Sequence, residues 1–346
     1  MKILKKIASS NMFPPLLALA LILLFNVVIQ PGFLSIEIRD GRFYGGLVNV
    51  LNRSVPVMLL ATGMTLVIAT GGTDLSVGSV LAVGSAVSIS LIRGSDTSPT
   101  ADTAMALWLV VIITMIIGAI CGLWNGFLVA KIGMPPVIAT LILMVAGRGL
   151  TQNITLERSV TTGHLPFGEI SNGFLFGLPN QIWIALVIFL LFWYFTRRTA
   201  FGLFIESVGA NRPAANLSGV KADSLIIIIY TLSGICAGVA GILNASNVRV
   251  IEPMRTGMNM ELDAILAVVL GGTSMSGGKF NLGGSCIGAI ILMALTQTMY
   301  FYGVPVEFSL SIKAVVIVLV VIIQSSTTRK FLASHIKFSR KREVSE

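Results

Sequence analysis

The sequence predicts an all-α integral membrane protein with about ten transmembrane helices, some of them broken at glycine. Three observations support this fold class. Of the 346 residues, 55% are hydrophobic and only 11% are charged, and the mean hydropathy is +0.89. The 35 glycines are spread through apolar runs, where small residues let transmembrane helices approach closely. Backbone groups in lipid must bond within the chain, so that the apolar runs are expected to be helical.

The expected spans follow the apolar runs in chain order. Uninterrupted apolar length predicts helices at residues 14–30, 46–70, 75–92, 105–130, 135–150, 180–196, 224–247, 261–275, 282–302 and 306–325. Lysines precede the first span, which lacks a small-residue cleavage site at its end. We therefore expect an uncleaved first span, an even number of crossings, and both termini in the cytoplasm.

The charge distribution supports this orientation. Most of the 24 Lys and Arg residues fall on the inferred cytoplasmic side, where residues 326–346 form a basic tail. Two loops are longer than simple connectors, at residues 151–179 outside and 197–223 inside, and long loops often carry function. We expect residues 1–346 to form a single transmembrane domain.

Several function classes are disfavoured. The net charge of +9 comes from short loops without a basic, aromatic-interleaved patch, so we expect no nucleic-acid partner. The three cysteines lack metal-type spacing, and we expect no metal site on this chain. No His-Glu-x-x-His or Gly-x-Ser-x-Gly motif occurs, so we expect no catalytic residue. The segment SGGKF has Phe280 where a nucleotide-binding loop needs Ser or Thr, so this chain is not expected to hydrolyse ATP.

Asp74 lies in the apolar stretch ATGMTLVIATGGTDLSVGSV at residues 61–80. A charge near the bilayer middle costs several kcal/mol unless it is hydrated or paired. The glycine pair before it favours ending one helix, and Thr73 or Asp74 can cap the next, with the carboxylate accepting from the N–H groups of Ser76 and Val77. Capping and lining of a substrate path are equally supported, and they are compatible if the break opens onto a cavity.

A second break, GGTSMSGGKFNLGG, follows the eighth span. Glycine-broken helices line substrate paths in many transporters, and their free N–H, C=O and hydroxyl groups suit an uncharged sugar. Asn125 is polar within an apolar span, where interhelical packing competes with a path-lining role. The candidate substrate-pathway residues are Thr73, Asp74, Ser76, Asn125, Thr273 and Ser274.

The inner loop is amphipathic in its middle part, which favours a cytoplasmic docking helix over an inert basic connector. Its segment ESVGANRPAANLSGV resembles the cytoplasmic loop of sugar-importing ATP-binding cassette (ABC) permeases of the ribose, xylose and galactose type. The segments GGTDLSVG, GLWNGFLVAKIG, GMPPVIATLILMVAGRGL and ELDAILAVVLGGTSMSGGKFNLGGS resemble that family too. The resemblance covers nearly the whole chain.

The resemblance implies a permease fold of the type II-like kind in a bacterial inner membrane, with inward transport of a monosaccharide. Within the family, the stretch at residues 40–72 implies galactofuranose or a related sugar. The implied partners are a second permease, identical or similar, a periplasmic or extracellular sugar-binding protein, and an ATPase subunit that carries ATP and Mg. The residues expected to couple to that ATPase are Glu206, Gly209, Asn211, Ala214, Ala215 and Gly219.

Glu261 and Asp263 open the eighth span at the predicted outer face. They are candidates for docking the binding protein, with helix capping as the alternative.

A different function class stays open at this point. A self-sufficient secondary transporter, driven by a proton or cation gradient, would use Asp74 and Lys313 as its ionisable pair. It predicts uptake by this chain alone.

Overall fold

The structure is a computed structural model that describes residues 13–29, 32–93, 105–305, 308, 310–315 and 318. Its helices, in chain order, are α2 (Phe13–Ile29), α3 (Gly46–Ala69), α4 (Val77–Arg93), α5 (Leu107–Phe127) with its π-helical extension η1 (Leu128–Ile132), α6 (Pro136–Thr155), α7 (Leu165–Asn172), α8 (Asn180–Arg198), α9 (Ala200–Ala210), α10 (Arg212–Leu217), α11 (Ala222–Val248), α12 (Met260–Leu270) and α13 (Leu282–Phe301). Short antiparallel strands pair β1 (Glu37–Arg39) with β2 (Arg42–Tyr44), β3 (Val160–Thr161) with β6 (Val250–Ile251), and β4 (Phe174–Leu175) with β5 (Leu178–Pro179).

The fold confirms the all-α membrane class. Within the described residues, six helices are long and apolar enough to cross a membrane, namely Gly46–Ala69, Leu107–Ile132, Pro136–Thr155, Asn180–Arg198, Ala222–Val248 and Leu282–Phe301. The segments Pro15–Val28, Val77–Arg93 and Ala200–Ala210 are shorter apolar helices. The basic tail and most of the last expected span lie outside the described residues. The expected count of ten is therefore not confirmed.

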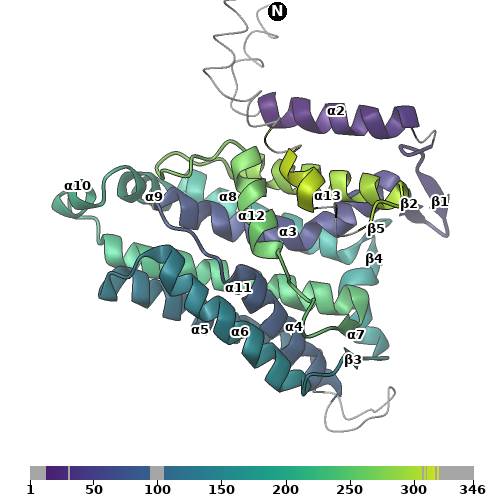
Figure 1. The fold of residues 1–346 in the computed structure, drawn as a ribbon, viewed down its shortest axis with the longest axis horizontal. Coiled ribbons are helices and arrows are strands. Elements are labelled where there is room, and N and C mark those ends of the chain that lie inside the picture. Colours follow the sequence, from purple (N-terminus) through teal and green to yellow (C-terminus); the bar gives the residue numbers. More distant parts are fainter. Residues whose placement is uncertain are drawn as a thin grey trace, which may run out of the picture.

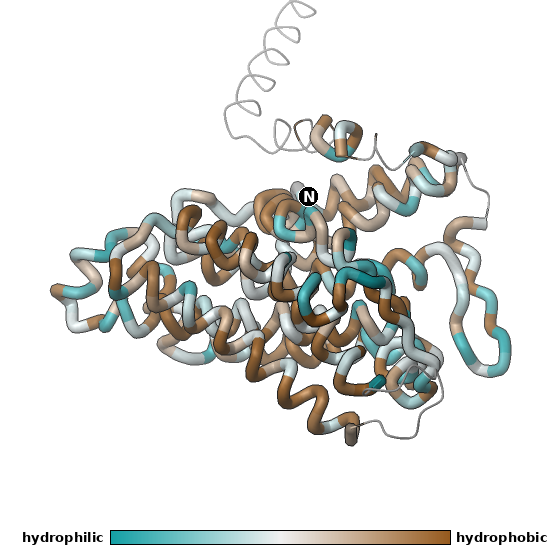
Figure 2. The backbone as a smooth tube through the Cα atoms, turned by 60° about the horizontal axis from the view of Figure 1, so that its bottom comes forward, coloured by the Kyte–Doolittle hydropathy of each residue, from teal (hydrophilic) through white to brown (hydrophobic). Residues whose placement is uncertain are grey.

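The two ends of the bundle differ (Figure 1). Helices α9 and α10 project at one end, and α7 lies with the strand pairs at the other. The charge distribution assigns the α9–α10 end to the cytoplasm. Hydrophobic residues run along the helices, and hydrophilic residues gather in the connecting segments (Figure 2). The side chains of α3 and α11 are mostly buried, whereas α5, α6 and α8 expose many large apolar side chains, as expected of lipid-facing helices.

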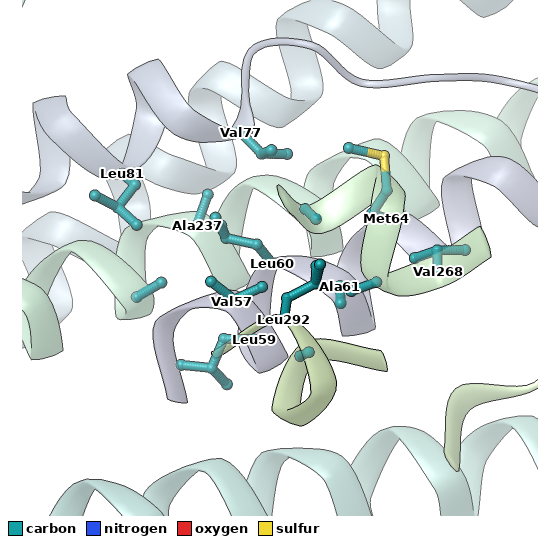
Figure 3. Packing of buried hydrophobic residues seen from close by; sticks show 14 of the residues in the cluster. Val57, Leu59, Leu60, Ala61, Met64, Val77, Leu81, Ala237, Val268 and Leu292 are labelled. Atoms are coloured by element: carbon teal, nitrogen blue, oxygen red, sulfur yellow. The ribbon is translucent and has the colours of Figure 1, made fainter. Parts of the chain in front are cut away.

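Helix α11 is central and packs on α3, α4 and α5. Its contact with α5 is built from glycine: a Cβ at Gly118 would overlap the carbonyl oxygen of Gly234, and a Cβ at Gly122 would overlap that of Tyr230. The glycines of each helix are four residues apart, Gly118 with Gly122 and Gly234 with Gly238, and this spacing gives the two helices flat faces on which they cross closely. The largest apolar cluster includes Leu60, Val77, Ala237, Val268 and Leu292 from α3, α4, α11, α12 and α13 (Figure 3), and it also contains residues of α2, α6 and α8.

Two expected boundaries are corrected. The eighth span does not run to residue 275, because α12 ends at Leu270 after 11 residues. At 1.5 Å per residue this helix is about 16 Å long, roughly half of a 30 Å hydrocarbon core. The fifth span continues to Thr155 rather than residue 150. The expected long outer loop is therefore shorter, and it contains the helix α7.

Candidate functional site

The two glycine breaks have the same turn. After α3, the N–H of Gly71 donates to the carbonyl of Ile68 (2.9 Å) and the N–H of Gly72 to that of Val67 (3.1 Å). After α12, Gly272 and Thr273 repeat these bonds with Val269 (2.9 Å) and Val268 (3.3 Å). Gly71 and Gly272 both have φ of +81°, a left-handed conformation in which glycine lacks the Cβ penalty. Each break is thus a Schellman ending that stops a helix inside the bundle.

Asp74 is buried in the first break, with 1% of its surface exposed. Its Oδ1 accepts from the Ser76 N–H (3.0 Å) and from the Ser76 hydroxyl (2.6 Å). The expected bond from the Ser76 N–H is therefore present, but it lies in the turn before α4, which begins at Val77. Asn125 from α5 donates to the Ser76 hydroxyl oxygen (2.8 Å) and lies 3.5 Å from Asp74 Oδ1. The structure therefore brings three predicted pathway residues together.

Helix α11 completes the Asp74 site with residues that the sequence analysis missed. The Ser233 hydroxyl donates to Asp74 Oδ2 (3.3 Å), and the Tyr230 hydroxyl donates to the carbonyl oxygen of Thr73 (3.4 Å). Thr140 of α6 reaches the same Thr73 carbonyl at 3.5 Å. The only signal for Tyr230 and Ser233 was their polarity within an apolar run.

The carboxylate of Asp74 is stabilised by neutral donors rather than by an ion pair. No Lys, Arg or His of the described chain lies within ion-pair distance of it. The site thus joins the α3–α4 break to α5 and α11 through hydrogen bonds.

The other two predicted pathway residues lie in the second break and do not join the Asp74 site. The Thr273 side chain is buried and accepts from the N–H of Asn281 (3.1 Å). The exposed Ser274 accepts from the N–H of Ser276 (3.2 Å). In the structure both side chains stabilise the turn that connects α12 to α13.

The predicted inner coupling loop folds as two helices, α9 and α10. Asn211 caps α10 by accepting from the N–H of Ala214 (3.0 Å). Ala214 is exposed, whereas Ala215 is 5% exposed and packs inward. Helices α9 and α10 form a helical hairpin, and Gly219, with φ of +88°, follows its end.

Charged contacts fix α10 to the bundle. Arg212 pairs with Asp223 of α11 (2.8 Å) and donates to the carbonyl of Ala130 (3.2 Å). Lys131 pairs with the same Asp223 (3.5 Å). Leu217, by contrast, is 91% exposed at the end of α10. Glu206 lies on α9, half-buried.

Glu261 and Asp263 are buried inside the bundle rather than placed on an outer rim. Asp263 forms an ion pair with Lys313 (3.0 Å). The side chain of Asp263 is 13% exposed and that of Lys313 is 9% exposed. Glu261 lies 3.7 Å from Arg148 of α6. Arg148 also donates to the carbonyls of Thr256 (2.7 Å) and Gly257 (2.8 Å), a clamp that sequence reasoning missed. The role of Glu261 and Asp263 in docking a binding protein stays a prediction.

The pair required by the secondary-transporter alternative does not form. Lys313 is bonded to Asp263, and Asp74 is bonded to Ser76 and Ser233. The two charged residues that this alternative would couple therefore belong to separate hydrogen-bonded groups.

Apolar spans, helices broken inside the bundle and a projecting helical hairpin define a multi-pass membrane permease. The chain belongs to the family described as the permease component of the branched-chain amino acid transport system, which matches residues 46–321. No solved structure is significantly similar to it.

Curated relatives are similar along most of their length. The galactofuranose transporter permease protein of Escherichia coli K12 is 44% identical over 90% of this chain and 89% of its own. The fructose import permease protein FruF of Bifidobacterium longum is 37% identical over 93% and 89%. The ribose import permease protein of Escherichia coli K12 is 37% identical over 90% and 92%.

Proposed function

We propose that this chain is the membrane permease of a bacterial ABC importer that moves a monosaccharide, galactofuranose or a related sugar, into the cell across the inner membrane. The observation that carries this proposal is the similarity to sugar permeases along about nine tenths of the chain. The α9–α10 hairpin supports it, because an element with a fixed base and an exposed apolar tip suits a cytoplasmic ATPase subunit. ATP and Mg bind to that subunit.

The broken helices supply the movable parts. The two breaks end helices within the bundle, and the hydrogen bonds of Asp74 fix the first break to α5 and α11. ATP binding and hydrolysis on the partner shift the α9–α10 hairpin, and the spans alternate between outward and inward access. Thr73, Thr273 and Ser274 of this chain lie along the sugar path. A second permease, identical or similar, forms the other side of that path.

The sugar-binding protein docks on the outer end. Glu261 and Asp263 take part only if docking opens the start of α12, because both side chains have partners within the chain. Release of these ion pairs by the binding protein would link docking to movement of α12.

Reconstitution tests the proposed function. The purified chain is placed in liposomes with the ATPase and binding-protein subunits encoded beside it, and uptake of radiolabelled galactofuranose is measured with and without ATP. ATP-dependent uptake that requires every partner is the expected result. Ribose and fructose serve as matched cargoes, and preferred uptake of either would redirect the assignment of the sugar. Uptake by this chain alone, abolished by an uncoupler, would overturn the proposal.

Ala214→Arg is expected to lower both uptake and ATPase stimulation about tenfold or more, because a large charged side chain at this exposed position of α10 prevents docking of the ATPase. Ala214→Ser is the matched control and is expected to behave like wild type. Insertion of both variants is compared by the amount of protein in purified membranes. Full uptake by inserted Ala214→Arg would contradict a docking role for α10.

A further inference from the structure

We propose that Gly209 and Gly278 are positioning residues of a backbone junction that transmits movement of α9 to both glycine breaks. The proposal rests on the proposed function, because it says how the ATPase-coupled hairpin reaches the helices that carry the sugar path. It is built on three segments that are distant in sequence and meet in space: the end of α3, the end of α9, and the loop between α12 and α13.

The junction is formed by main-chain atoms. The N–H of Gly278 donates to the carbonyl oxygen of Ala69, the last residue of α3 (2.8 Å). At the preceding residue, Gly277, an added Cβ would lie 2.9 Å from the carbonyl oxygen of Gly209 and 3.0 Å from the N atom of Gly71. The first break, the second break and α9 are therefore in direct contact.

Glycine is required at position 209 because α9 packs directly against the hydrogen bond between Gly278 and Ala69. A Cβ there would overlap the Ala69 carbonyl oxygen and lie 2.5 Å from the Gly278 N atom. Both are backbone atoms, which cannot rotate away as a side chain could. A methyl group at position 209 thus forces α9 away from the bond that joins the breaks.

Gly278 meets a different requirement. Its φ is +88°, in the left-handed region, and a Cβ added to it would meet no atom within 4 Å. Gly278→Ala therefore strains the backbone that presents the N–H to Ala69, without filling any space. The two glycines allow the junction to be disturbed in two independent ways, by contact at Gly209 and by conformation at Gly278.

A second contact joins the same parts of the molecule. At the end of α8, just before α9, Arg197 donates to the carbonyl oxygen of Phe280 (3.2 Å), and its guanidinium lies 5.6 Å from the centre of the Phe280 ring. Phe280 follows Gly278 and directly precedes the Asn281 cap of α13. The α8–α9 corner is thus joined to the second break through Phe280, by a hydrogen bond to its carbonyl oxygen and by a contact with its ring.

These contacts define a short route for coupling. Displacement of α9 acts through Ala69 on the segment that leads to Asp74, and through Gly278 and Phe280 on the segment that begins α13. Direct contacts between backbones leave no side-chain rotamer to absorb the movement. The junction therefore makes the two breaks respond together to a single displacement.

The test compares coupling in four variants within the full importer in liposomes. Gly209→Ala and Gly278→Ala disturb the junction. Gly241→Ala is the matched control for Gly209, because its Cβ would lie 2.5 Å from the carbonyl oxygen of Leu81 and 2.9 Å from the N atom of Ser85, which are backbone atoms of α4 outside the junction. Gly133→Ala is the control for Gly278, with φ of +77° and no atom within 4 Å of a Cβ. Assembly with the ATPase, basal ATP hydrolysis, and hydrolysis stimulated by sugar-loaded binding protein are measured for each.

In importers that have assembled with the ATPase, stimulated hydrolysis and sugar moved per ATP are expected to fall about tenfold in both junction variants, the size of a typical coupling loss. The controls are expected to stay within about twofold of wild type. Wild-type coupling in both junction variants would overturn the proposal, as would an equal loss in Gly241→Ala. A wild-type importer without ATP-driven uptake would instead overturn the proposed function, so the two failures are distinguishable.

Discussion

Asp74→Ala is expected to abolish sugar uptake and to destabilise the protein by about 2–4 kcal/mol, because it removes the acceptor shared by buried donors. Those donors are the Ser76 N–H and hydroxyl and the hydroxyl of Ser233. Asp74→Asn keeps an oxygen that can accept from Ser76, so it is expected to lose less than half as much stability as the alanine variant. Thermal unfolding in detergent, followed by tryptophan fluorescence, measures stability, and liposome uptake measures transport.

Ser88→Ala is the matched control for Asp74. Ser88 is equally buried in α4, but within the described part of the chain its hydroxyl donates only to the Ser85 carbonyl of the same helix (2.9 Å). Its removal is expected to cost about 1 kcal/mol or less. If both Asp74 variants take up sugar like wild type, the carboxylate has no role beyond packing. If Asp74→Asn is stable but inactive, the charge itself is needed for transport.

Lys313→Met is expected to destabilise the protein by about 3–5 kcal/mol, because it leaves the carboxylate of Asp263 buried without its cation. Both partners are held inside the bundle, and Lys313 bonds to both carboxylate oxygens, at 3.1 and 3.0 Å. Asp263→Asn combined with Lys313→Met removes both charges together. The double variant is therefore expected to be more stable than Lys313→Met alone.

The exposed pair Arg255–Glu252 is the matched control for this cycle. Its side chains are 82% and 52% exposed, and Arg255→Met is expected to change stability by less than about 1 kcal/mol. Thermal unfolding of the single and double variants gives the coupling energy between Asp263 and Lys313. Additive losses would contradict a direct buried ion pair.

The comparison of sequence and structure separates local from non-local information. The cap from Asp74 to Ser76 was predictable, because both residues belong to one turn. The close crossing at Gly118 was predictable from glycine spacing within one helix, although its partner Gly234 was not. The partner of Lys313 was not predictable either, because Asp263 lies 50 residues away and the pairing depends on how two helices are rotated.

The length of α12 shows a related difficulty. Residues 271–275, Gly-Gly-Thr-Ser-Met, carry no charge, and a span drawn up to the next charged residue takes them into the helix. The left-handed turn at Gly272 and the packing of Gly271 against Gly284 of α13 end it earlier. The outer-rim position expected for Glu261 was inferred from a full-length span. A half-length helix instead places that residue beside Arg148, inside the bundle.

The sequence by itself determined the membrane class, most of the spans, the two glycine breaks and the family resemblance, because apolar length, glycine positions and short motifs are written in consecutive residues. Only the tertiary structure decided that α11 completes the Asp74 site, that Asp263 meets Lys313, and that Gly209 contacts both breaks. Each of these contacts depends on the relative rotation and depth of separate helices. Those quantities are set by the packing of the whole bundle, which no single segment specifies.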